Sequence, residues 1–194
     1  MGKGLFRYGF VLVIAIILQF ITCYQKPDIT FSEALPILAL YLIFNLGVGL
    51  FEEVLCRGVL FNSFKEYFGD DKKGVYKAIF LSSGIFGIFH LINLISYPTL
   101  IIGTITQVLY AFFFGVIFCT VYYRSKNLLA GIILHALFDY GNVFWKCLSS
   151  NRIMLLESST NSDMKISESL IVLGLTSIFF IASMIQLKKE FSKE

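Results

Sequence analysis

Six long apolar runs constrain this chain more than any other feature of its sequence. Each is about 20 residues long, the length that an α-helix needs to cross the hydrocarbon core of a bilayer. The predicted spans are Leu5–Tyr24, Leu35–Arg57, Tyr76–Ile95, Leu100–Tyr123, Leu128–Leu148 and Ser167–Leu187. The chain is 57% hydrophobic and 15% charged, whereas soluble domains are roughly 45–50% apolar and about 25% charged. Because the runs lack the alternation of an outer-membrane barrel, they predict an all-α, polytopic membrane protein with about six transmembrane helices.

The segments between the runs are too short to fold alone, so we expect residues 1–194 to form a single membrane-embedded domain. The first run has a basic start, but its end lacks the small residues of a signal-peptide cleavage site, which favours a retained helix. Apolar residues after Arg57 recur at helical spacing as far as Gly69. This spacing predicts that the second span continues as an amphipathic helix at the membrane interface. Ser167 is the expected N-cap of the last span.

The basic residues indicate an orientation for these spans. If the N-terminus is cytoplasmic, the cytoplasmic segments carry 12 of the 16 Lys and Arg residues. This bias follows the positive-inside rule and predicts a multi-pass protein of the cell membrane with both termini in the cytoplasm. A net charge of +3 is too small to indicate nucleic-acid binding, so the expected partners are the lipid bilayer and a membrane-associated substrate.

Several ionisable side chains lie in or beside the apolar runs, although each costs on the order of 2.5–3.5 kcal/mol at the centre of a membrane helix. Glu53 and Arg57 are four residues apart, so they share a helix face and can form an ion pair. Glu52 lies about 100° further around the helix and has no cationic partner within this segment. A desolvated carboxylate without such a partner suits a general base acting on water. Glu52 is therefore predicted to be catalytic and Glu53 structural, although the two glutamates could exchange these roles.

The only two histidines of the chain lie inside two other apolar runs. Phe86 precedes His90 by four residues and can orient or desolvate its imidazole. His135 and Asp139 also share a helix face, where the carboxylate can fix the tautomer of the imidazole or hold it protonated. The positions of these residues along their spans allow a single site in the cytoplasmic half of the membrane.

The four cysteines form no metal-binding or redox pair in the sequence, and each lies in or beside an apolar run. We interpret Cys23, Cys56, Cys119 and Cys147 as small buried hydrophobic residues. Cys56 lies between Glu53 and Arg57, which leaves a thiol nucleophile as a minor alternative.

Taken in order, these residues reproduce the three motifs of a known family. The chain resembles the CPBP family, the CAAX protease and bacteriocin-processing group that is also called the Abi family and is related to Rce1-type prenyl-protein proteases. The motifs are Glu52-Glu53-x-x-x-Arg57, Phe86-x-x-x-His90 and His135-x-x-x-Asp139. They cover a core of about residues 35–148, and each motif is weak alone but specific in combination.

The resemblance implies an intramembrane endopeptidase that acts on CAAX-type peptides or on bacteriocin or signal-peptide precursors. It also implies that Glu52 and His90 activate the attacking water, while His135 and Asp139 stabilise the oxyanion. Members of the family are described both as metalloproteases and as metal-free glutamate proteases.

The residues themselves do not decide whether the protein binds a metal ion. Two histidines and a carboxylate make a sensible catalytic zinc set, which could come from Glu52, His90, His135 and Asp139. The chain has no His-Glu-x-x-His helix, so we expect no cofactor, with zinc as the alternative. Two other functions remain open: a non-catalytic immunity or scaffold protein of the same fold, and a small proton-coupled transporter.

Overall fold

The computed structural model describes residues 2–151 and 164–192, and all regular secondary structure in these ranges is helical. The all-α class expected from the apolar runs is therefore confirmed. The π-helical segments are η1 (Lys3–Tyr8) and η2 (Val54–Phe61), and η3 (His90–Ile92) is a 3-10 turn. The α-helices are α1 (Phe10–Thr22), α2 (Phe31–Glu53), α3 (Asn62–Phe68), α4 (Lys72–Phe89), α5 (Asn93–Ser96), α6 (Ile101–Ser125), α7 (Leu128–Cys147) and α9 (Ile166–Glu190).

Five helical segments in the described part of the chain are long and apolar enough to cross a membrane. They are Phe31–Phe68, Lys72–Ser96, Ile101–Ser125, Leu128–Cys147 and Ile166–Glu190, and they correspond to the second to sixth predicted spans. The first predicted span is helical over most of its length, but a bend at Gly9 divides it into η1 and the 13-residue α1. A Cβ atom at Gly9 would lie 2.7 Å from the backbone carbonyl oxygens of Gly4 and Leu5, so this position favours a residue without a side chain.

The second span continues beyond Arg57 as expected. The helix runs without a break through α2, η2 and α3, and it ends at Gly69, whose φ of 93° favours glycine. At the last span the expected cap is wrong by two residues. Helix α9 begins at Ile166 with Lys165 as its N-cap, because the Lys165 backbone N–H donates to Glu168 Oε2 at 3.0 Å.

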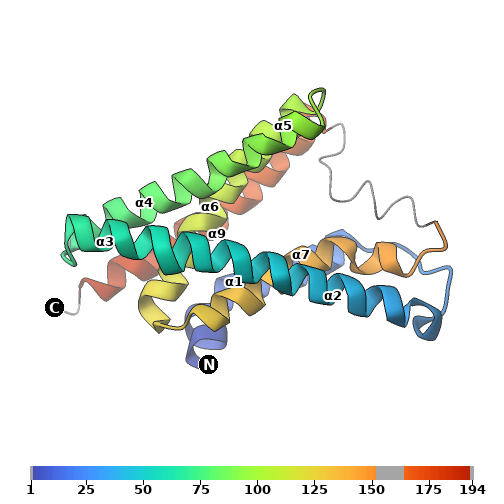
Figure 1. Cartoon of the computed structure of the whole chain (residues 1–194), viewed down its shortest axis with the longest axis horizontal. Helices are drawn as coiled ribbons and strands as arrows, with labels where there is room; N and C mark the ends of the chain where they lie inside the picture. The colour runs from blue at the N-terminus through green and yellow to red at the C-terminus, as the bar shows by residue number, and fades with distance from the viewer. Residues whose placement is uncertain (1, 152–163, 193–194) are drawn as a thin grey trace.

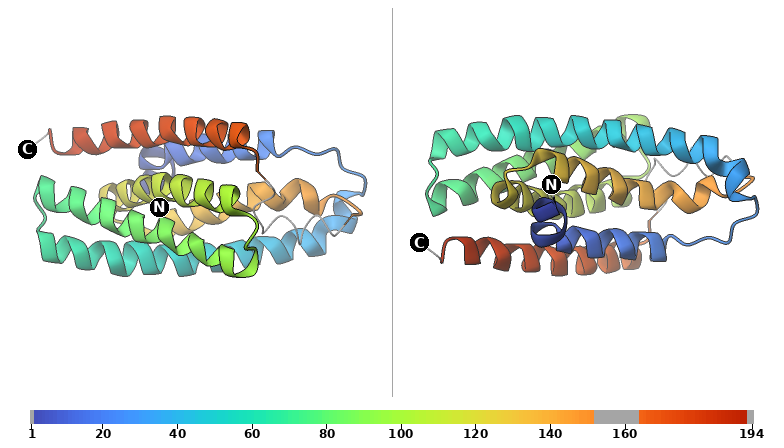
Figure 2. Two further views of the ribbon diagram at one scale, coloured as in Figure 1. Left: turned by 90° about the horizontal axis from the view of Figure 1, so that it is seen from above. Right: turned by 90° about the horizontal axis from the view of Figure 1, so that it is seen from below.

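The helices form two groups that diverge from a shared end. Helices α1, α2 and α7 pack together, and α4, α6 and α9 pack together. Figure 1 shows the two groups separating toward one end of the molecule, while α3 packs against α4 at the other end. In the two views of Figure 2, which look along the direction in which the groups separate, the helices lie roughly along the long axis of the molecule. Both termini lie toward the end that carries α3 and the turn between α6 and α7 (Figure 1).

Close packing between α2 and α7 positions the site. A Cβ atom at Gly49 would lie 2.9 Å from the Ile132 carbonyl oxygen, so the glycine lets the two backbones approach each other. Gly49 precedes the glutamate pair by one helical turn, and Ile132 precedes His135 by three residues. The contact therefore brings the first and third motifs together.

Candidate active site

The three predicted motifs meet around the imidazole of His135. Glu52 and Glu53 end α2, Arg57 lies in η2, Phe86 lies near the end of α4, and His135 and Asp139 lie on one face of α7. All of these side chains are linked by direct contacts. His90 contacts Phe86 directly and interacts electrostatically with His135 and Asp139.

Glu53 is the centre of a fully buried network. Its Oε1 atom lies 3.0 Å from Arg57 Nη1 and accepts a 2.8 Å hydrogen bond from His135 Nδ1. Glu53 and Arg57 have no exposed surface, and His135 is 6% exposed. The predicted Glu53–Arg57 pair is therefore present, but the sequence did not indicate the bond from Glu53 to His135. This bond fixes the direction in which the other ring nitrogen of His135 points.

Arg57 is enclosed by a carbonyl group and two aromatic rings. Its Nη2 atom donates to the Gly115 carbonyl oxygen of α6 at 3.2 Å. Its Cζ atom lies 4.7 Å from the centroid of the Phe86 ring and 5.1 Å from that of Phe118. A guanidinium over aromatic faces gains cation–π attraction, which offsets part of its desolvation cost. The π-helical turn that carries Arg57 begins directly after Glu53, and such turns are frequent at functional sites.

The second ring nitrogen of His135 faces two further carboxylates. His135 Nε2 lies 3.3 Å from Glu52 Oε2 and 3.5 Å from Asp139 Oδ2. The side chains of Glu52 and Asp139 are 28% and 33% exposed, in contrast to the buried Glu53. Glu52 has no cationic partner within its own helix segment, as expected, and its contact is His135 on α7.

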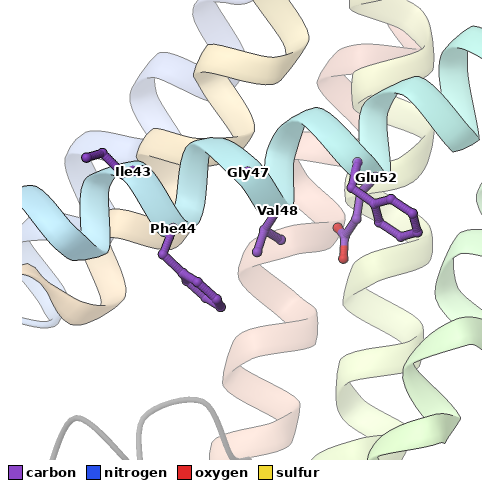
Figure 3. A pocket seen from close by; sticks show the side chains of 6 residues that line it. Ile43, Phe44, Gly47, Val48 and Glu52 are labelled. Carbon is purple, nitrogen blue, oxygen red and sulfur yellow. The ribbon is translucent and has the colours of Figure 1, made fainter.

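Glu52 also borders an open pocket of about 440 Å³ on one face of α2. The other residues that line it are apolar: Ile43, Phe44, Gly47, Val48 and Phe51. Figure 3 shows the carboxylate of Glu52 on the same side of α2 as Phe44 and Val48, directed toward this pocket. A carboxylate at the edge of an otherwise apolar pocket can meet both a water molecule and an apolar ligand.

His90 lies at the point where α4 tightens into the 3-10 turn η3. Its Nδ1 atom is 3.0 Å from the Phe86 carbonyl oxygen, and its ring meets the Phe86 ring edge to face at a centroid distance of 5.1 Å. Phe86 therefore orients His90, as the spacing predicted. The Phe86 ring also lies 6.0 Å from the His135 ring. No hydrogen bond or ion pair links His90 to Glu52 in the part of the chain that the structure describes.

Sequence reasoning missed two residues that touch the network. Phe118 of α6 stacks on His135 with a centroid distance of 4.9 Å and an interplanar angle of 21°. Gly131 of α7 leaves room for Glu53, because a Cβ atom there would lie 3.1 Å from Glu53 Oε2. Neither belongs to a motif, and Phe118 is one of 21 phenylalanines in the chain.

The four cysteines are free thiols, and Cys56, Cys119 and Cys147 are buried. The Sγ atom of Cys119 lies 3.4 Å from the Ser82 hydroxyl, and Cys56 packs against Phe86 and Ala111. In residues 2–151 and 164–192, no group of three or more His, Cys, Asp and Glu side chains is arranged to hold a metal ion. The zinc alternative stays a prediction, and the reaction proposed for this site uses its side chains alone.

The three motifs and the site that they form fall within one region of family similarity. No characterised protein and no solved structure shows significant similarity to this chain. A family model described as type II CAAX prenyl endopeptidase Rce1-like matches residues 34–141, which is more than half of the 194 residues. The chain therefore belongs to the Rce1-like family of type II CAAX prenyl endopeptidases.

Proposed function

We propose that this protein hydrolyses a peptide bond of a membrane-associated peptide or protein, with Glu52 as the general base. Membership of the Rce1-like family implies a protease. The observation that carries the assignment to Glu52 is its position beside both an open pocket and the buried imidazole of His135. Glu53, in contrast, has both a cation and an imidazole on one oxygen and no contact with the pocket.

The reaction follows from these positions. Glu52 takes a proton from a water molecule as the water oxygen bonds to the scissile carbonyl carbon, and the carbonyl electron pair moves to its oxygen. The Nε2–H group of His135 donates to this oxyanion, and Asp139 at 3.5 Å supports the positive charge on the ring. The carbon–nitrogen bond then breaks, and the leaving amine takes the proton that Glu52 carries.

His90 is proposed to hold the attacking water opposite Glu52. Its Nδ1 atom is held by the Phe86 carbonyl oxygen at 3.0 Å, which leaves Nε2 as the nitrogen for this contact. Among the described residues no hydrogen bond or ion pair joins His90 to Glu52, and a water molecule that bridges them is the arrangement that we propose. Apo sites often show such loose geometry before the substrate binds.

The test is cleavage of a fluorogenic farnesylated CAAX peptide by the purified protein in detergent. Glu52→Ala, His90→Ala and His135→Ala are each expected to abolish cleavage while the protein still inserts and accumulates. The losses of activity should not be additive when the variants are combined, because all three residues serve the same reaction. Substantial activity in any one variant would remove that residue from the catalytic set. An inert parent protein with this peptide and with its non-prenylated counterpart would favour a non-catalytic immunity or scaffold role, or transport.

We further propose that the cleaved bond lies near a membrane boundary, on an extended or easily unwound segment. A helix hides its carbonyl groups in its own hydrogen bonds, so the scissile bond must leave that conformation. Comparison of membrane and secreted peptides from cells with the parent or with Glu52→Ala should show one precursor that accumulates uncut. Removal of the membrane anchor of that precursor should abolish its cleavage. Efficient cleavage of a soluble, unanchored peptide would contradict this proposal.

The site is proposed to open toward the cytoplasmic half of the bilayer, with both termini in the cytoplasm. The support is the bias of 12 among 16 basic residues. Asn161, which precedes the last predicted span, lies outside the described residues, so the outer label is placed at Thr99, which is exposed. In a background without native cysteines, Asp71→Cys should react only from the cytoplasm and Thr99→Cys only from outside. Labelling of position 71 in intact cells would reverse the orientation.

A further inference from the structure

The ring of Phe118 makes the closest aromatic contact with the imidazole on which the site is built. The two ring centroids are 4.9 Å apart and the planes are 21° from parallel, so the contact is a stack. Phe118 is 2% exposed and belongs to α6, which carries none of the three motifs. It therefore reaches the site from a separate element of the fold.

The contacts that His135 makes through its two ring nitrogens do not by themselves fix the plane of the ring. Glu53 holds Nδ1 at 2.8 Å, and Glu52 and Asp139 lie 3.3 and 3.5 Å from Nε2. The contacts at Nε2 are long, so a tilt of the ring about its axis would cost little there. A flat, buried partner on one face is what opposes such a tilt, and Phe118 provides this partner.

Phe118 also contacts the cation that neutralises Glu53. The Arg57 Cζ atom lies 5.1 Å from the centroid of the Phe118 ring. One phenyl ring thus contacts both groups that bind Glu53 Oε1, and its electron-rich face favours positive charge on each of them. Removal of the ring would loosen Arg57 and His135 together.

We propose that Phe118 is a positioning residue, which fixes the plane of His135 so that Nε2 faces Glu52 and Asp139 beside the pocket. This inference rests on the proposed function for its effect on catalysis, but not for its effect on the imidazole. A leucine at position 118 would fill part of the volume without a flat face. A tyrosine would keep the face and the stack.

The first measurement is independent of activity. The chain contains only two histidines, so selective labelling gives a simple NMR spectrum of their rings in detergent. A phenyl ring stacked on an imidazole shifts the imidazole signals by its ring current. Phe118→Leu is therefore expected to move the signals of His135 and to leave those of His90 in place, whereas Phe118→Tyr should preserve both. Unchanged His135 signals in Phe118→Leu would overturn the proposal.

The second measurement is the kinetics of cleavage of the farnesylated CAAX peptide. Displacement of a catalytic group by about 1 Å can cost on the order of 100-fold, so we expect Phe118→Leu to lower kcat by roughly 10- to 100-fold. KM should change little, because Phe118 does not line the pocket. Phe118→Tyr should restore most of kcat. Phenylalanine analogues with increasing ring fluorination should lower kcat stepwise at constant size, because the ring face loses its attraction for the two cations.

The matched control is Phe114, which lies one helical turn earlier on α6 and is 5% exposed. Its ring packs against Phe138 at a centroid distance of 4.5 Å. Phe114 has no role in the proposed site. Phe114→Leu should lower thermal stability about as much as Phe118→Leu does, while kcat and the His135 signals remain unchanged. An equal loss of kcat in both variants would assign Phe118 to general packing. A parent protein that cleaves nothing would reject the proposed function, and the NMR comparison would still decide the role of Phe118.

Discussion

The two sides of His135 differ sharply, although each contains one of the two adjacent glutamates at the end of α2. On the Nδ1 side, Glu53 and Arg57 are fully buried and share a 3.0 Å ion pair. On the Nε2 side, Glu52 and Asp139 are 28% and 33% exposed and lie 3.3 and 3.5 Å from the ring. The buried side is tightly held and closed, whereas the other side is loose and reaches an open pocket.

This difference indicates how one short sequence can serve structure and chemistry at once. A rotation of about 100° per residue sends successive side chains of a helix in different directions. Glu53 therefore points into the contact with α7, while Glu52 borders the pocket on α2. If the comparison is correct, changes on the pocket side should remove activity, and changes on the buried side should remove stability.

The largest expected effect is on activity at Glu52. Glu52→Gln keeps the size of the side chain and removes its ability to take a proton, so we expect cleavage to fall by at least about 100-fold, the lower end of general-base contributions. The thermal midpoint in detergent should remain close to that of the parent. Glu66→Gln is the matched control, because Glu66 lies further along the same continuous helix and is exposed. A Glu52→Gln variant that is active but unstable would reverse the assignment of the two glutamates.

The next effect is on stability at Glu53 and Arg57. Glu53→Gln leaves a buried guanidinium without its counter-charge, which costs roughly 3–5 kcal/mol. Arg57→Ala should act in the same way, with a lower yield of solubilised protein and a lower thermal midpoint. The double variant Glu53→Gln with Arg57→Ala should lose less than the sum of the two single changes, because neither charge remains.

A surface ion pair gives the control for this prediction. Arg124 Nε and Glu190 Oε2 are also 3.0 Å apart, but their side chains are 12% and 35% exposed. Glu190→Gln should therefore cost less than about 1 kcal/mol. If Glu53→Gln and Arg57→Ala are inactive yet as stable as the parent, the buried pair belongs to the chemistry and the comparison fails.

A smaller effect is expected when the buried side is crowded without a change of charge. In Gly131→Ala the new Cβ atom would lie 3.1 Å from Glu53 Oε2, a buried atom with no hydrogen-bond partner among the described residues. Overpacking of this kind costs about 1–3 kcal/mol. Gly84→Ala is the control, because a Cβ atom at Gly84 would meet nothing within 4 Å. Equal stability of the two variants in thermal unfolding would show that Glu53 is held less rigidly than its contacts indicate.

The sequence predicted the fold and the pairs within each helix, but not the contacts between helices. Apolar length gave the five long spans, and a spacing of four residues gave the Glu53–Arg57 pair and the orientation of His90 by Phe86. The bond from Glu53 to His135 depends on how α2 and α7 approach each other at Gly49, which no local pattern specifies. Phe118 is likewise distinguished from other phenylalanines only by the packing of α6. The first helix was predicted, but the bend at Gly9 that divides it was not, because hydropathy does not detect a bend at one glycine.

The smallest effect on stability is expected at an exposed carboxylate, which serves as a reference for the effects at Glu52 and Glu53. Asp28, between α1 and α2, accepts hydrogen bonds from the Ser150 backbone N–H at 2.6 Å and the Ser150 hydroxyl at 2.9 Å. These bonds hold the pKa of Asp28 below its usual value, and the bond from the Ser150 hydroxyl has the larger effect. A carboxyl group with a lowered pKa in the folded protein adds stability above its unfolded pKa of about 3.9, and this stability is lost as the pH falls through the folded value. Asp28→Asn should therefore lower the thermal midpoint slightly and constantly from pH 7 to about pH 5, and the difference from the parent should shrink below about pH 4. A midpoint difference that is as large as that of Glu53→Gln, or that persists unchanged to about pH 3, would show that exposure does not separate these carboxylates in the way the comparison requires.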